Sequence, residues 1–169
     1  MTAYDDEIHK MRTLPIVWRR LVGARGTTCP RCHGTGEEVR RAVTQLRTAL
    51  EPWGIEPVLE EREIDQAAFL QDPLQSNQVL ISGKLLDDWL SGQTGSSRCC
   101  NECGDRDCRT LEVEGQTYEI IPEGLVVRAG LIAAAHLPDA APSPRACSAA
   151  CCDTAKASDD AVAGRGRPG

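Results

Sequence analysis

Large aromatic side chains and long apolar runs are scarce in this chain. Only 4% of its 169 residues are aromatic, so a core must be built from Leu, Ile, Val and Ala. The most apolar stretch, 125–137, is interrupted by Arg128 and is shorter than the roughly 20 residues that span a bilayer. The first fifteen residues hold no apolar run, which excludes a secretory signal there. We expect a cytoplasmic protein with no membrane partner.

Positive charge and the common cofactor motifs are also missing. The formal net charge is −6, which argues against a nucleic-acid partner. The sequence has no glycine-rich phosphate loop, no GxSxG and no convincing pair of carboxylates. We therefore expect no nucleotide cofactor, and the oligomeric state stays open.

Cysteine, in contrast, is abundant and clustered. The chain has nine cysteines, and in the cytosol such residues are more often metal ligands or redox groups than disulfides. The odd count agrees, because complete pairing within the chain would leave one thiol over. The three clusters are Cys29 and Cys32; Cys99, Cys100, Cys103 and Cys108; and Cys147, Cys151 and Cys152.

Periodicity predicts an α/β domain over residues 14–137, after an N-terminal extension at 1–13. Alternating or apolar runs favour strands, and apolar residues three and four apart favour helices. The expected elements are a strand at 14–22, a helix at 37–51, a strand at 55–64, a short helix at 65–71, a strand at 78–82, a helical turn or two at 84–90, a hairpin at 109–122 and a closing helix that starts at Pro122 and stops at Pro138.

Two segments of this pattern have no regular structure of their own. The Cys-rich loop, residues 91–108, is longer than the ~12–15 residues at which structureless loops become uncommon, so it is either disordered or pinned by something. Residues 138–169 are rich in Ala, Pro, Ser, Gly and Asp and predict a disordered tail. The expected order is therefore β-α-β-α-β-(Cys loop)-β-β-α, followed by the tail.

This order, with Cys29-Pro30-Arg31-Cys32 between the first strand and the first long helix, resembles the thioredoxin/glutaredoxin superfamily. More narrowly, the chain resembles an uncharacterised bacterial thioredoxin-like family with a CPxC motif and a CCxxC loop. The resemblance implies a dithiol in which Cys29 attacks a disulfide and Cys32 resolves it. Two features depart from it: Ser76-Asn77 stands where thioredoxins have a proline before the third strand, and Gly34 and Gly36 fall where thioredoxins have continuous helix.

The same glycines create a competing motif. Residues 29–36 read C-x-x-C-x-G-x-G, which resembles the zinc-binding repeat of DnaJ-type chaperones, where two cysteines supply half of a tetrahedral site. That domain needs several repeats close together, and here there is one. The flanking strand and amphipathic helix favour the thioredoxin-like interpretation.

The middle cluster gives the strongest metal signal. Cys99, Cys100, Cys103 and Cys108 lie within ten residues and can form a closed four-thiolate zinc site that would order the loop. Adjacent cysteines are equally suitable ligands for a softer ion such as Hg(II), As(III), Cd(II) or Cu(I). Spacing alone leaves both open.

The tail repeats the theme with Cys147, Cys151 and Cys152. About fifteen residues separate His136 from Cys151, which gives a root-mean-square reach of roughly 20 Å, and we expect this reach to bring the tail cysteines to Cys29 and Cys32 or to the Cys-rich loop. A mobile vicinal pair near a CxxC resembles the terminal dithiol of mercuric reductases, which collects a soft ion and passes it inward. The alternative is that the tail cysteines have no functional role.

The sequence thus predicts a thioredoxin-like domain that binds or transfers soft metal ions or metalloids through cysteine thiolates. The predicted metal ligands are the middle and tail clusters, and Cys29 and Cys32 are catalytic if they cycle between thiol and disulfide. One alternative is a thiol-disulfide oxidoreductase, which would need a thiol-reducing partner protein. Another is a zinc-stabilised interaction domain. The identity of the metal stays open.

Overall fold

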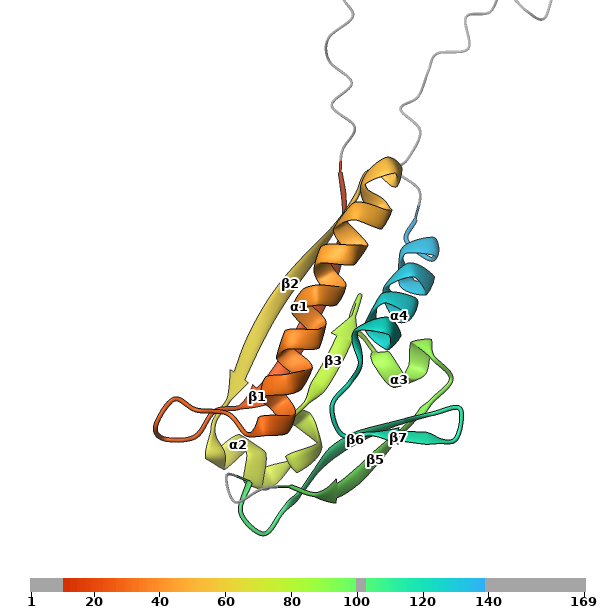
Figure 1. Cartoon of the computed structure of the whole chain (residues 1–169). Coiled ribbons are helices and arrows are strands. Elements are labelled where there is room, and N and C mark those ends of the chain that lie inside the picture. The colour runs from red at the N-terminus through yellow and green to blue at the C-terminus, as the bar shows by residue number, and fades with distance from the viewer. Residues whose placement is uncertain (1–10, 100–102, 139–169) are drawn as a thin grey trace, which may run out of the picture.

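The structure is a computed structural model that describes residues 11–99 and 103–138. It is a mixed α/β fold with two separate sheets (Figure 1). In chain order the elements are β1 (Arg12–Leu21), α1 (Pro30–Leu50), η1 (Glu51–Trp53), β2 (Ile55–Ile64), α2 (Gln66–Gln71), η2 (Pro73–Gln75), β3 (Gln78–Ile81), β4 (Lys84–Leu85), α3 (Leu86–Trp89), β5 (Gln93–Arg98), β6 (Asp107–Val113), β7 (Gln116–Tyr118) and α4 (Glu123–Ala135).

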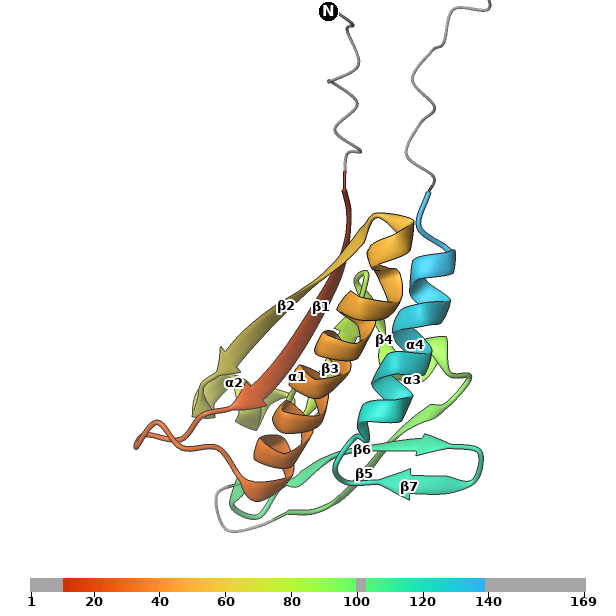
Figure 2. The same ribbon diagram turned by 45° about the horizontal axis from the view of Figure 1, so that its top comes forward.

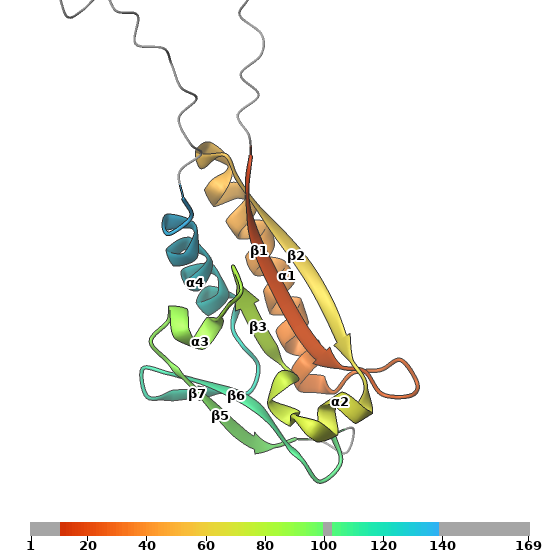
Figure 3. The same cartoon turned by 180° about the vertical axis from the view of Figure 1, so that it is seen from behind.

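The larger sheet has the strand order β2-β1-β3-β4. Strands β1 and β2 run parallel, joined by the crossover helix α1, whereas β3 pairs antiparallel with both β1 and β4. Side chains alternate between the two faces of a strand, and on β1 the buried set is Leu14, Ile16 and Trp18. Helices α1 and α4 lie side by side against this apolar face (Figure 2), and Figure 3 shows β1 and β2 from the opposite side, in front of α1.

Helix α1 begins at Pro30, seven residues before the expected start at 37. Proline suits the first turn of a helix because its missing N–H would be unsatisfied there, and the Cys29 side chain caps the helix by accepting from the backbone N–H of Cys32. The glycines in this turn lie where other elements pack closely: a Cβ on Gly34 would meet Ile120, and one on Gly36 would overlap the indole of Trp18. The early glycines therefore allow close packing and do not interrupt the helix.

The smaller sheet has the order β5-β6-β7 and is antiparallel throughout. The expected hairpin is confirmed: Glu114 and Gly115 both have positive φ, at 54° and 77°, as a two-residue hairpin turn requires. The expectation that residues 91–108 lack regular structure was wrong for Gln93–Arg98, which form β5. This strand is specified by its partner, since Gly95 leaves room for the side chains of β6.

A buried ion pair ties the smaller sheet to the rest of the fold. The guanidinium of Arg109 on β6 lies 2.5 Å from the Asp87 carboxylate of α3, and both side chains are about 5% exposed. Arg109 also donates to Thr94 on β5 and to the carbonyl of Leu74. The smaller sheet is thereby held beneath the N-terminal end of α1 (Figure 1).

No helix in the described part of the chain combines the length and the apolarity needed to cross a membrane.

The packing of α1 on β1 makes a testable prediction about Gly36. The Trp18 indole is 1% exposed and has the guanidinium groups of Arg20 and Arg40 5.3 and 5.6 Å from its ring, so it cannot yield to an added methyl group. We expect Gly36→Ala to lower the free energy of unfolding by about 1–3 kcal/mol, the usual cost of overpacking, measured by urea denaturation.

The matched control is Gly124→Ala in the first turn of α4, where an added Cβ meets nothing within 4 Å. Alanine is the better helix former, so this variant should be as stable as the wild type or more stable. Equal stability of both variants would contradict the proposed packing role of Gly36.

Candidate metal centre

Cys29 and Cys32 lie where β1 gives way to α1. Cys29 is the N-cap of the helix, and its Sγ lies 3.5 Å from the backbone nitrogen of Cys32. Cys32 is inside the first turn, with its Sγ 3.4 Å from the hydroxyl oxygen of Ser76. Ser76 also accepts a hydrogen bond from the backbone N–H of Leu21. Ser76 is therefore in direct contact with Cys32.

The smaller sheet brings three further cysteines to the same place. Cys99 directly follows β5, Cys103 lies ahead of β6, and Cys108 is on β6, paired with Ser97 of β5. The Sγ atoms of Cys29 and Cys99 are 3.6 Å apart, and those of Cys103 and Cys108 are 3.0 Å apart. We call these five residues the thiol cluster.

Three sulfurs of the thiol cluster converge on one point. The Sγ atoms of Cys29, Cys99 and Cys103 all lie within 4.8 Å of one another, and we call these three the trithiolate group. In the described part of the chain this is the one set of three potential metal ligands at such distances. The residues come from segments 70 positions apart, so the site exists only in the folded protein.

The thiol cluster is closed to solvent except at one sulfur. Cys29, Cys32, Cys103 and Cys108 are each at most 2% exposed, whereas Cys99 is half-buried. Cys99 is thus the most exposed member of the thiol cluster. This enclosure is typical of a metal centre, and it is unlike an exposed nucleophile that must meet a protein disulfide.

Sharing of protons between neighbouring sulfurs sets the electrostatics of the site. Hydrogen bonds from the thiols of Cys103 and Cys32 hold the pKa of the Cys29 thiol far below its usual value, against the opposing effect of burial. The pKa of Cys103 is raised, first by its hydrogen bond with Cys108 and then by that with Cys29. The pKa of Cys32 is raised by its hydrogen bond with Cys29 and by burial. Cys29 is thus the first thiolate of the group at neutral pH, and an ion that recruits Cys103 must displace its proton.

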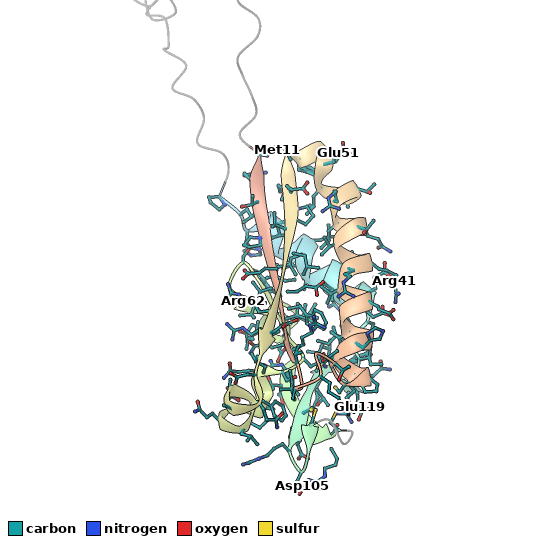
Figure 4. The ribbon with its side chains drawn as sticks, turned by 90° about the vertical axis from the view of Figure 1, so that its left-hand side faces the viewer. Met11, Arg41, Glu51, Arg62, Asp105 and Glu119 are labelled. Atoms are coloured by element: carbon teal, nitrogen blue, oxygen red, sulfur yellow. The ribbon has the colours of Figure 1, made fainter. Side chains whose placement is uncertain are left out.

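Arg31, between the two cysteines of the CPxC motif, fastens the smaller sheet to α1. Its guanidinium donates to the backbone carbonyl of Ser97, at 3.3 Å, and to that of Arg98, the residue before Cys99. It also forms an ion pair with Glu119 at 2.5 Å. In Figure 4, Glu119 and Asp105 lie at the end of the molecule that carries these contacts, opposite Met11 and Glu51. One side chain thereby holds Cys99 against Cys29.

The structure groups the cysteines differently from the sequence analysis. The sequence indicated Cys29 and Cys32 as a separate dithiol and Cys99, Cys100, Cys103 and Cys108 as the metal site, whereas the structure brings Cys29 into contact with the loop cysteines. Spacing could not reveal this, because the contact is made by the fold. The one available signal was that a long cysteine-bearing loop needed something to hold it. Cys100 and the predicted tail ligands Cys147, Cys151 and Cys152 lie outside the described residues.

The zinc-repeat resemblance of residues 29–36 has a structural explanation. The segment from Pro30 onward is the first part of α1, and Gly34 and Gly36 make room for Ile120 and Trp18. His33 is 67% exposed and faces Glu37, at 3.6 Å. The glycines are therefore accounted for by helix packing, and His33 is not one of the three grouped ligands.

Comparison with known proteins identifies a family for this chain, but the matching descriptions name no activity. Residues 14–130 match the model of a family described as a domain of unknown function (DUF2703). A protein from Archaeoglobus fulgidus, described as uncharacterized, is 44% identical over 113 residues, which cover 67% of this chain and 82% of the relative. No solved structure matches significantly.

The Arg31 contacts predict a change in the accessibility of Cys29. In metal-free Arg31→Ala protein, β5 loses the hydrogen bonds that hold Cys99 over Cys29. Hydrogen bonds to a charged donor contribute about 1.5–3 kcal/mol, so we expect alkylation of Cys29 by iodoacetamide to become about tenfold faster or more. Mass spectrometry of the labelled peptides measures it.

Arg98→Ala is the matched control for this experiment. Arg98 lies on the same strand, but its side chain is 65% exposed and donates to Asp105, in the turn before β6. Alkylation of Cys29 should stay slow in this variant. Equally fast alkylation of Cys29 in the wild type and in Arg31→Ala would show that Arg31 does not hold Cys99 over Cys29.

Proposed function

The chain belongs to the family of the domain of unknown function DUF2703, and we propose that this member binds a soft metal ion or metalloid through cysteine thiolates. The observation that carries the proposal is the convergence of the Cys29, Cys99 and Cys103 sulfurs within 4.8 Å. Three buried or half-buried thiols from distant segments have little reason to meet unless something binds them. The ion would take the trithiolate group as its ligands.

The distances between these sulfurs support an ion of ordinary size. A zinc–sulfur bond of about 2.3 Å places two tetrahedral ligands roughly 3.8 Å apart, and a trigonal arrangement places them roughly 4.0 Å apart. The Cys29 and Cys99 sulfurs are 3.6 Å apart, and the rest of the group is within 4.8 Å. Closure around an ion therefore needs side-chain movements of less than about 1 Å.

The donor set favours the thiophilic ions. Thiolates select Zn(II), Cd(II), Hg(II), As(III) and Cu(I) over the hard ions that prefer oxygen. A fourth sulfur from Cys108, 3.0 Å from Cys103, would complete a tetrahedral site for structural zinc and so support the zinc-stabilised interaction domain. Three sulfurs suffice for trigonal As(III) or Hg(II). The number of sulfurs bound to the ion separates the two.

The scaffold that we propose is thioredoxin-like. Support comes from the strand order β2-β1-β3-β4, with β1 and β2 parallel and β3 antiparallel, and from the CPxC motif at the start of α1. The smaller sheet then replaces a direct connection between β4 and the closing helix. On this scaffold Ser76 supports Cys32 from the position of the superfamily's proline.

The same scaffold makes a dithiol-disulfide oxidoreductase the second candidate. The lowered pKa of Cys29, with its cap position on α1, is what a nucleophilic thiol requires. Its 2% exposure opposes this role, because the sulfur of Cys99 lies against it. A redox cycle on protein substrates would need the smaller sheet to move away, whereas ion binding needs it where it is.

We also propose that the tail cysteines transfer the ion to the thiol cluster, although the distance between the two limits this step. Arg12 donates to the carbonyls of both Pro138 and Trp53, so the described chain ends beside the C-terminal end of α1. A helix of 21 residues is about 31 Å long, and the thiol cluster is at its other end. A tail reach of roughly 20 Å falls short of this, so Cys151 and Cys152 would deliver an ion only from extended conformations.

Metal analysis tests the binding proposal directly. Anaerobically purified protein should carry close to one equivalent of a thiophilic ion, or take up Cd(II) to that extent, with a thiolate-to-metal charge-transfer band in the ultraviolet. Cys99→Ser and Cys103→Ser should each lose the band, because each removes a ligand. Cys32→Ser is the matched control: it removes a buried sulfur that lies outside the trithiolate group, and it should retain the band.

Wild-type protein that folds identically with and without Cd(II) and shows no charge-transfer band would refute the site. X-ray absorption of the loaded protein then separates the two classes of ion site, since four sulfur neighbours indicate structural zinc geometry and three indicate the softer-ion geometry.

Truncation after Leu137 tests transfer. Because the tail supplies none of the trithiolate group, the truncated protein should bind Cd(II) with unchanged affinity. If the tail captures ions, uptake of Hg(II) or As(III) from competing small thiols should become slower, as followed by stopped-flow absorbance. Uptake at the rate of the full chain would show that the tail cysteines take no part.

A further inference from the structure

The sulfurs of Cys103 and Cys108 approach each other more closely than a mere neighbour contact requires. Their Sγ atoms are 3.0 Å apart, and a disulfide bond is about 2.05 Å long, so bond formation needs about 1 Å of movement. Cys108 is fixed in β6 by its pairing with Ser97. Cys103 lies in the turn ahead of that strand, where a small shift is easier.

Only one of these two cysteines is a ligand of the proposed ion site. Cys103 belongs to the trithiolate group and Cys108 does not. We propose that Cys103 and Cys108 form a reversible disulfide that withdraws Cys103 from the site and so releases the bound ion. This inference rests on the proposed ion binding, and it assigns the site an oxidative control.

Hydrogen peroxide is the oxidant that fits the enclosure. Both residues are 1% exposed, and such burial hinders glutathione disulfide or a protein disulfide far more than a molecule as small as peroxide. In the three-sulfur site Cys108 is the sulfur that reacts first, because it is not one of the trithiolate group that holds the ion. The Cys103 sulfur is then the one in position to respond.

The chemistry balances in two steps. The Cys108 thiolate attacks peroxide: an S–O bond forms, the O–O bond breaks, and the departing hydroxide takes up a proton to become water. The Cys103 sulfur then attacks the sulfenic sulfur of Cys108: the S–S bond forms, the S–O bond breaks, and a second water leaves. The two thiols lose two electrons and two protons, and a reducing dithiol reverses the change by exchange.

The consequence for the ion follows from the lost ligand. A disulfide sulfur carries no negative charge and no longer binds the ion as a thiolate does, so Cys29 and Cys99 alone remain of the trithiolate group. Removing an outer-shell partner of a metal ligand costs about 10- to 100-fold in affinity. Removing the ligand itself should weaken Cd(II) binding by at least about 100-fold.

The full-length chain allows the bond to be mapped directly. Trypsin cuts after Arg98, Arg106 and Arg109, which separates Cys103 in peptide 99–106 from Cys108 in peptide 107–109. Metal-free protein treated with one equivalent of peroxide should give these two peptides joined, with the bond located at Cys103 by fragmentation. Glutathione disulfide at the same concentration should give far less of the joined pair.

The control of the ion is measured on Cd(II)-loaded protein. Peroxide should release Cd(II) from the wild type, a reducing dithiol should restore binding, and Cys108→Ser should retain Cd(II) through the same treatment. Gly124→Ala, which lies on α4 outside the thiol cluster and where an added Cβ meets nothing within 4 Å, is the control, and it should release Cd(II) as the wild type does.

The outcomes separate this inference from the proposed function. Wild-type protein that never binds Cd(II) would remove the ion site, and with it the control of release, while the peptide map would still report the disulfide by itself. Normal Cd(II) binding with equal release from Cys108→Ser and the wild type would overturn the switch alone. A map that joins Cys29 to Cys32, or Cys100 to Cys103, would also overturn it.

Discussion

The contact between the first turn of α1 and the end of β5 determines whether this protein has a site at all. Arg31 donates to the carbonyls of Ser97 and Arg98 and pairs with Glu119, and these bonds set the position of Cys99 over Cys29. Without them the cysteines of the CPxC motif would be an ordinary dithiol at a helix terminus. With them, the sulfur of Cys29 at the N-cap of α1 lies against the sulfur of Cys99, 70 residues further along the chain. Arg31, between the two cysteines of the motif, thus sets the position of Cys99 relative to Cys29.

The smaller sheet covers the N-terminal end of α1, and it is held there by a buried ion pair as well as by apolar packing. The Arg109–Asp87 pair is buried, and removing one partner from such a pair leaves an uncompensated charge that is costly to keep in the interior. Arg109 also contacts Thr94 and Leu74, so one guanidinium joins β5, β6 and η2. The neighbouring residue on β6 is Cys108. The anchor therefore holds the strand that carries one sulfur of the thiol cluster, whereas Cys103 lies in the turn ahead of that strand.

The sequence predicted the elements that depend on local pattern. The β-branched and aromatic residues of 14–22 indicated β1, and alternation on both sides of Glu114-Gly115 indicated the hairpin. In the structure both turn residues have the positive φ that this turn needs. It placed the start of α1 too late, since glycine has low helix propensity, and only the packing of Gly36 against Trp18 explains why glycine is present.

Features set by distant partners could not be predicted in this way. Strand β5 has small polar residues and a glycine, and its conformation is fixed by its pairing with β6. The thiol cluster has the same character: spacing reveals pairs such as Cys29 and Cys32, whereas the meeting of Cys29 with Cys99 depends on how two sheets are docked. The residues of the centre were therefore visible in the sequence, and their grouping was not.

Charge balance determines which of the enclosed thiols are ionised. Thiolates in a site of low exposure repel one another, and burial raises the pKa of each; hydrogen bonds from neighbouring thiols offset this for Cys29 but leave Cys103 protonated. Under the proposed function a bound cation would remove the conflict, because it would replace the shared protons and let all three sulfurs carry charge. A trivalent ion would neutralise three thiolates completely, and a divalent ion would leave one negative charge. Since the Arg31 guanidinium is already paired with Glu119, the charge of the ion itself would decide how well the enclosed site is neutralised.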